Sequence, residues 1–185
     1  MLSILIVPIR SIDQAELTIL ASPLSNAFDL PVSIEESNYL NPSFALDTYR
    51  NQFNSTSIIS ALLDRFPAHS GKIIGITTVD LFVPVLTYVF GEAQLNGRIA
   101  VLSFYRLREA LYGMFPNPKL EQIRLLKEAI HELGHTFGLV HCYNPGCVMH
   151  SSTSPEEIDV KGKSFCKGCG QMVKSSISLL REQAL

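Results

Sequence analysis

The chain contains 185 residues with a formal net charge of −2, and its residues are 46% hydrophobic but only 17% charged. This length is typical of a single domain, and so large an apolar share excludes an intrinsically disordered chain. The near-neutral charge, without basic blocks, argues against binding to nucleic acid or to an anionic membrane surface.

The N-terminal part, residues 1–115, alternates between strand and helix patterns. The first apolar run follows no positively charged leader, so it indicates a buried strand rather than a signal peptide. Ser11 or Asp13 can cap the helix that comes next. The pattern predicts strands at 3–9, 30–34 and 72–76, and helices at 13–27 and 55–66.

A hairpin signal follows these elements. Asn96 and Gly97 separate two segments rich in strand-forming residues, 88–94 and 98–104, and a two-residue Asn-Gly loop is a strong indicator of an antiparallel pair. Consecutive strands joined by helices favour parallel pairing elsewhere. We therefore predict an α/β fold with a twisted, mostly parallel sheet, one antiparallel edge strand and helices packed on it.

The best-marked helix begins at Pro118. Asn117 can accept hydrogen bonds from its first free amides, and proline suits a first helical position because no amide hydrogen is needed there. Gly138 is a natural terminator. Between them the helix carries one apolar stripe, formed by Leu126, Ile130, Leu133 and Phe137.

After Gly138 the composition changes to a loop-rich segment that extends to about residue 168, followed by a closing helix at 172–183. We place a lobe boundary here, so that residues 1–138 form an N-terminal lobe ending in the long helix. Residues 139–185 form a small C-terminal lobe of the same compact domain.

Three histidines near the end of the long helix point to a metal. His131 and His135 are four residues apart and share a helix face, with Glu132 beside them. A turn at Gly138 lets His141 return as a third ligand. Three imidazoles with an open fourth position are the pattern of a catalytic zinc, and Glu132 is placed to act as a base on water activated by the metal.

The four cysteines indicate a second metal. Cys142, Cys147, Cys166 and Cys169 form C-x₄-C and C-x₂-C pairs in the last quarter of the chain. Four thiolates make a closed tetrahedral shell, which is typical of a structural zinc. Disulfides and an iron–sulfur centre are the alternatives.

The histidine motif resembles the long zinc-binding signature of the metzincin metallopeptidases. Met149, eight residues after the third histidine, resembles the methionine of their Met-turn, whose side chain lies under the zinc without binding it. With the four cysteines added, the pattern of residues 131–169 resembles the archaemetzincins in particular. The resemblance implies two zinc ions per chain, one catalytic and one structural.

The resemblance also implies a function: hydrolysis of peptide bonds, with zinc-activated water and Glu132 as base and then acid. The implied substrate is a peptide or small protein. The enzyme is either an aminopeptidase or an endopeptidase with restricted substrates, and the resemblance does not separate the two. The alternatives are a catalytically silent, zinc-stabilised module that binds peptides or proteins, and a zinc hydrolase of a non-peptide amide.

Two further expectations concern the substrate-binding cleft. In metzincins an edge strand binds the extended substrate, and residues 88–94 are the candidate here; a plain edge strand is the alternative, and Gly91→Pro is the obvious test. Ser151 stands where some metzincins place a tyrosine that assists catalysis.

We expect a cytoplasmic monomer with no membrane span, because the longest apolar stretch falls short of the roughly 18 residues needed.

Overall fold

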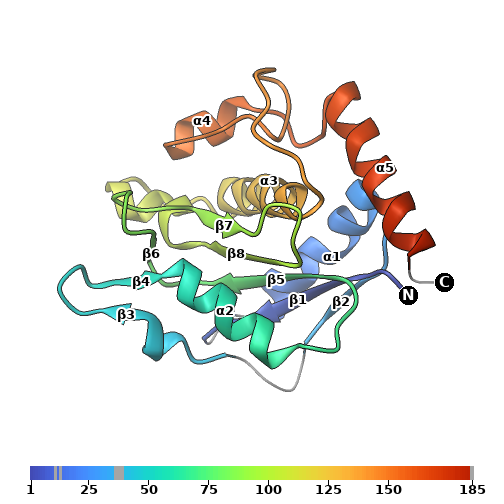
Figure 1. The fold of residues 1–185 in the computed structure, drawn as a ribbon. Helices are drawn as coiled ribbons and strands as arrows, with labels where there is room; N and C mark the ends of the chain where they lie inside the picture. Colours follow the sequence, from blue (N-terminus) through green and yellow to red (C-terminus); the bar gives the residue numbers. More distant parts are fainter. Residues whose placement is uncertain (11, 13, 36–39, 184–185) are drawn as a thin grey trace.

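The computed structural model describes residues 1–10, 12, 14–35 and 40–183 (Figure 1). Its main sheet has five strands in the order β2-β1-β5-β8-β7. Every pairing is parallel except that of β7 with β8, which lies at the edge. The fold class predicted from the sequence is therefore confirmed. The strands are β1 Ile4–Pro8, β2 Val32–Ile34, β5 Lys72–Thr77, β7 Gly91–Ala93 and β8 Ile99–Ser103.

Helices cover both faces of this sheet. α1 (Gln14–Phe28) and α3 (Pro118–Thr136) pack on one face, and α2 (Ser55–Arg65) packs on the other. All residues of the central strand β5 are buried, because side chains alternate between the two covered faces. Ser11 and Asp13, the expected capping residues of α1, lie outside the described residues.

Several short elements were missed by the sequence prediction. A second, three-stranded sheet has the order β3-β4-β6 and is too short to show a period in the sequence. A further helix, α4, lies in the segment predicted as loop, and the closing helix α5 begins at Lys167 rather than at residue 172. The bounds are β3 Leu46–Asp47, β4 Gln52–Asn54, β6 Leu81–Phe82, α4 Pro155–Val160 and α5 Lys167–Glu182; short 3₁₀ turns are Pro42–Ala45, Tyr105–Leu107 and Glu109–Tyr112.

The hairpin loop is longer than predicted. The Gln94 amide donates to the Ile99 carbonyl at 2.9 Å, which leaves the four residues 95–98 in the loop instead of two. Asn96 has a φ of 54°, and its amide donates to the carbonyl of His135 at 2.9 Å. The loop is thus shaped by its contact with the C-terminal end of α3.

Both predicted ends of α3 are confirmed. The Asn117 side chain accepts a hydrogen bond from the Leu120 amide at 3.2 Å. At the other end Gly138 has a φ of 90°, which favours glycine. Its amide donates to His135 and the Leu139 amide donates to Gly134, so the helix closes with its last carbonyls satisfied.

The C-terminal segment shares the hydrophobic core of the sheet. Val148 and Met149 from the loop after α3, and Val173 and Ile177 from α5, are buried in the same cluster as the apolar faces of α1 and α3. Among the described residues, no helix is long and apolar enough to span a membrane.

Lys72 joins the hairpin loop to α3. Its ammonium is buried and donates to the carbonyls of Gly97 and Thr136, both at 2.7 Å. Burial, with a smaller contribution from Arg98, lowers the pKa of Lys72 from 10.5 to about 8.

The lowered pKa of Lys72 predicts a pH dependence of stability. Between pH 8 and 10.5 the unfolded chain binds more protons than the folded one, so stability rises with pH there. The unfolding free energy of the parent minus that of Lys72→Met should therefore rise by about 2–3 kcal/mol across this range in denaturant titrations. Lys174→Met, at an exposed position on α5, should give a flat difference; a flat difference for Lys72→Met as well would contradict the prediction.

Candidate metal centre and active site

Three histidines converge at the end of α3. His131 and His135 lie one helical turn apart, and their Nε2 atoms are 3.1 Å from each other. Beyond Gly138 the chain returns and brings His141 to the same place. One ring nitrogen from each histidine lies within 4.8 Å of the others, so the structure brings together the three predicted ligands.

The hydrogen bonds of these rings identify the atoms that face a metal. Nδ1 of His131 donates to the Val148 carbonyl at 2.9 Å, and Nδ1 of His135 donates to the Leu139 carbonyl at 2.7 Å. Each neutral ring therefore carries a lone pair on Nε2. Two lone pairs 3.1 Å apart repel each other unless a cation lies beside both, so the donor set fits a metal ion.

The surroundings keep the histidines neutral. Burial lowers the pKa of His131 well below 6.5, and the nearby Lys161 ammonium lowers it further. Burial likewise lowers the pKa of His135 and His141. Neutral imidazole is the form that binds metal ions.

Glu132 lies beside the histidines, against the edge strand. Its carboxyl is buried, and burial together with Glu128 and Glu92 raises its pKa well above 4.5. A Cβ atom at Gly91 would lie 2.7 Å from Cγ of Glu132 and 2.8 Å from Oε1. Because any side chain at position 91 displaces this carboxyl, Gly91→Pro does not isolate the role of strand β7.

Met149 lies directly under α3. It is fully buried, and its carbonyl accepts a hydrogen bond from the Cys142 amide at 2.9 Å. A Cβ atom at Gly134 would lie 2.5 Å from the Met149 sulfur, so only glycine leaves room for this side chain beneath the helix.

Lys161 and Glu128 were not singled out from the sequence. Lys161 Nζ lies 2.7 Å from Glu128 Oε1 in a buried ion pair, and 3.4 Å from Nδ1 of His131. It also donates to the His150 carbonyl at 3.1 Å. The lysine therefore joins α3 to the loop after Met149, and no sequence spacing links it to Glu128.

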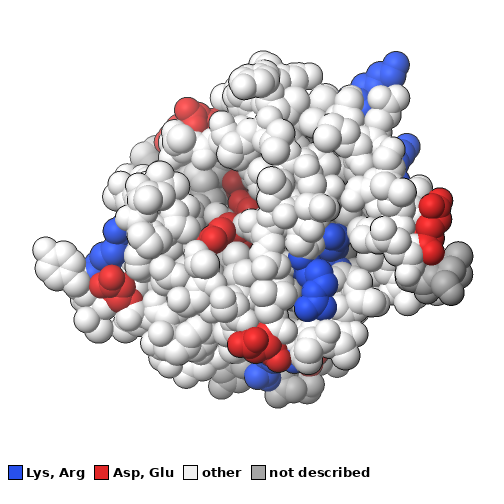
Figure 2. Space-filling view, viewed as in Figure 1, with Lys and Arg blue, Asp and Glu red and all other residues white. Residues whose placement is uncertain are grey.

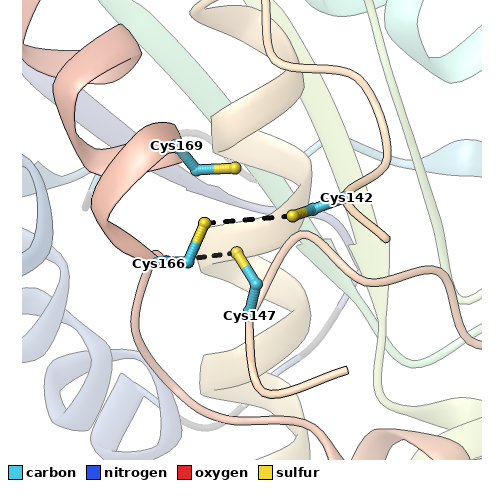
Figure 3. Close-up of side chains that lie close together, drawn as sticks. All are labelled: Cys142, Cys147, Cys166 and Cys169. Atoms are coloured by element: carbon cyan, nitrogen blue, oxygen red, sulfur yellow. Dashed lines mark hydrogen bonds between the residues drawn. The ribbon is translucent and has the colours of Figure 1, made fainter. Parts of the chain in front are cut away.

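The four cysteines form a second cluster (Figure 3). Cys142 and Cys147 come from the loop after α3, whereas Cys166 and Cys169 lie at the start of α5. Their sulfurs lie within 4.8 Å of one another, and all four thiols are free. The Cys169 amide lowers the pKa of the Cys166 thiol to about 7, whereas burial raises the pKa of the Cys147 and Cys169 thiols, so the network favours a thiolate at Cys166. Four converging sulfurs with no disulfide fit a tetrahedral metal ion.

A cavity of about 670 Å³ opens over the histidines. Residues 86–93 form one wall, α3 forms the floor, and residues 140–141 and 151–153 form the opposite wall. Figure 2 shows this face with a hollow that contains acidic side chains. The charged residues among the described lining are acidic: Glu92, Glu128 and Glu132.

Known proteins resemble this chain along most of its length. Residues 43–175 match peptidase family M54. An archaemetzincin of Pyrococcus furiosus is 39% identical over 171 residues, which cover 90% of this chain and 89% of that protein.

Two crystal structures share the fold. A zinc-dependent peptidase from Methanocorpusculum labreanum has a TM-score of 0.83 and 28% identity, covering 92% of this chain and 100% of that one. An archaemetzincin from Archaeoglobus fulgidus has a TM-score of 0.79 and 34% identity, covering 92% and 99%.

The close packing of Gly134 against Met149 predicts an unusual response to alanine. Gly134→Ala should lower the unfolding free energy by about 1–2 kcal/mol, because overpacking of ~1–3 kcal/mol outweighs the helix gain of ~0.5–1 kcal/mol. Gly170→Ala in α5, where the new Cβ would lie 3.7 Å from its nearest neighbour, should be neutral or stabilising. Equal effects of the two substitutions in denaturant titrations would contradict this packing argument.

Proposed function

The chain belongs to peptidase family M54, the archaemetzincins, a family of zinc-dependent metallopeptidases, and from this premise we propose that it hydrolyses peptide bonds with Glu132 as general base and acid. The observation that carries the proposal is the convergence of three neutral imidazoles on the floor of an open cavity, with one buried carboxyl beside them. A binding module needs no carboxyl at that point.

We assign zinc to both clusters. His131, His135 and His141 would hold a catalytic zinc, and the four cysteines would hold a structural one, which makes two ions per chain. At the histidine site the ion supplies Lewis acidity: it lowers the pKa of water toward about 7 and polarises a carbonyl group.

Glu132 performs the proton transfers in this proposal. Burial raises the pKa of Glu132 above that of an exposed glutamate, so its carboxyl holds a proton more readily, which suits a group that must both accept and release one. Contact with Gly91 on one side and burial on the other restrict the movement of the carboxyl. The proton that Glu132 takes from water is then available to the leaving amine.

Met149 is assigned as the methionine of a Met-turn. Its side chain packs under Gly134, which lies between His131 and His135 in the sequence of α3. The Cys142 amide donates a hydrogen bond to the Met149 carbonyl and holds it in place. Its role in this proposal is to support the metal site from below without binding the ion.

The substrate is proposed to be a peptide that lies along β7. This strand pairs with β8 on one side and ends the sheet, and residues 86–93 line the cavity. An extended peptide can therefore be bound by main-chain pairing at this edge. A cytoplasmic location and a monomeric state stay predictions from the sequence.

Digestion of a diverse peptide library tests the proposal. The zinc-loaded parent should cleave peptides, and Glu132→Gln should reduce the rate by roughly 10²–10⁴-fold with unchanged zinc content. Glu182→Gln, at an exposed position on α5, is the matched control and should cleave like the parent. Undiminished cleavage by Glu132→Gln would remove Glu132 from the mechanism, and no cleavage by the folded, zinc-loaded parent would overturn the peptidase proposal.

A further inference from the structure

One hydrogen bond connects the two walls of the cavity. The Tyr88 hydroxyl, on the wall that contains β7, donates to the Thr153 carbonyl on the opposite wall at 2.6 Å. Both residues line the cavity. A peptide backbone cannot pass between two groups in hydrogen-bond contact, so this bridge obstructs a peptide that runs along this wall past Tyr88.

The Tyr88 side of the bridge is held firmly. The Arg106 guanidinium lies over the tyrosine ring, 4.3 Å from its centroid, and is itself bound through two hydrogen bonds to Asp80. The preceding residue is fixed as well, because the Thr87 carbonyl accepts from Arg50 at 3.0 Å and from Gln52 at 3.0 Å. The ring is therefore positioned before any substrate arrives.

The Thr153 side is fixed in the same way. A Glu157 carboxylate oxygen accepts hydrogen bonds from the amide of Thr153 at 2.5 Å and from its hydroxyl at 3.0 Å. Glu157 belongs to α4. This helix is joined to α3 by two hydrogen bonds that the Arg124 guanidinium donates to the Asp159 carboxylate. Both walls of the cavity are thus built to keep the bridge closed.

The distance from the bridge to the catalytic carboxyl sets a length limit. Gly91 contacts Glu132, and Tyr88 is three residues earlier in the chain. Three residues span at most about 10 Å, and an extended substrate along the same edge advances by about 3.3 Å per residue. At most about three substrate residues therefore fit between the cleaved bond and the bridge.

We propose that the Tyr88–Thr153 bridge determines substrate length, so that this protein cleaves peptides within about three residues of one terminus. The inference rests on the proposed peptidase function and specifies its substrate class. It makes Tyr88 a specificity-determining residue that takes no part in the bond cleavage itself. A chain that extends further on that side must break the bridge in order to bind.

Two variants test the bridge. Tyr88→Phe removes only the hydroxyl and keeps the ring under Arg106. Tyr112→Phe is the matched control, because the Tyr112 hydroxyl donates to the Arg106 carbonyl at 3.0 Å but does not line the cavity. Mass spectrometry of digests of long peptides should place all cuts by the parent and by Tyr112→Phe within about three residues of one terminus, and Tyr88→Phe should add cuts further inside. Mid-chain cuts by the parent, or identical products from Tyr88→Phe, would overturn the proposal.

A binding measurement separates this proposal from the peptidase function. Peptidyl and succinyl hydroxamates anchor to a zinc ion and extend a peptide toward the N-terminal or the C-terminal side. For one of the two series, affinity for the zinc-loaded parent should fall roughly tenfold between three and five residues, the equivalent of one lost hydrogen bond. Tyr88→Phe should not show this fall. A length limit on binding without any cleavage would contradict the peptidase proposal alone. Equal affinity at all lengths in both series would contradict the proposal that the bridge limits substrate length.

Discussion

One loop, residues 139–149, orients all three histidines of the candidate metal site. It supplies His141, and its carbonyls at Leu139 and Val148 accept the Nδ1 hydrogens of His135 and His131. Those two hydrogen bonds select the tautomer that leaves both Nε2 lone pairs free for a metal. The arrangement of the candidate site thus depends on where this loop lies relative to α3.

The loop is fixed at both ends by local chemistry. At its start, Gly138 adopts a left-handed conformation that stops α3. If the helix had continued from Thr136 to His141, the five added residues would have carried His141 away from the other two rings. At its other end the cysteine cluster joins the loop to α5, with Cys142 next to His141 and Cys147 two residues before Met149. A zinc ion in that cluster would therefore stabilise the position of the third histidine and of the methionine beneath the helix.

The parts of the site that sequence could predict are those encoded by spacing. Histidines one turn apart, a glycine stop and two cysteine pairs all lie close together in the chain, and the ends of α3 follow from Asn117 and Gly138. The contacts that complete the site join distant segments: Lys161 with Glu128, Gly91 with Glu132, and Tyr88 with Thr153. Strands of two or three residues, such as β6, are held by their neighbours and have no period to detect.

The dependence of the histidine site on the cysteine cluster is tested most directly by Cys166→Ser. Cys166 is the N-cap of α5, a position that serine suits, so the helix start is preserved while one thiolate is lost. Metal analysis should find two zinc ions in the parent and one in the variant. Competition titration should then show that the remaining ion is bound about 10–100-fold more weakly than the parent's histidine zinc, the usual cost of losing a group that supports metal ligands. An unchanged affinity at the histidines would contradict the account, because the loop would then hold its position without the cysteine metal.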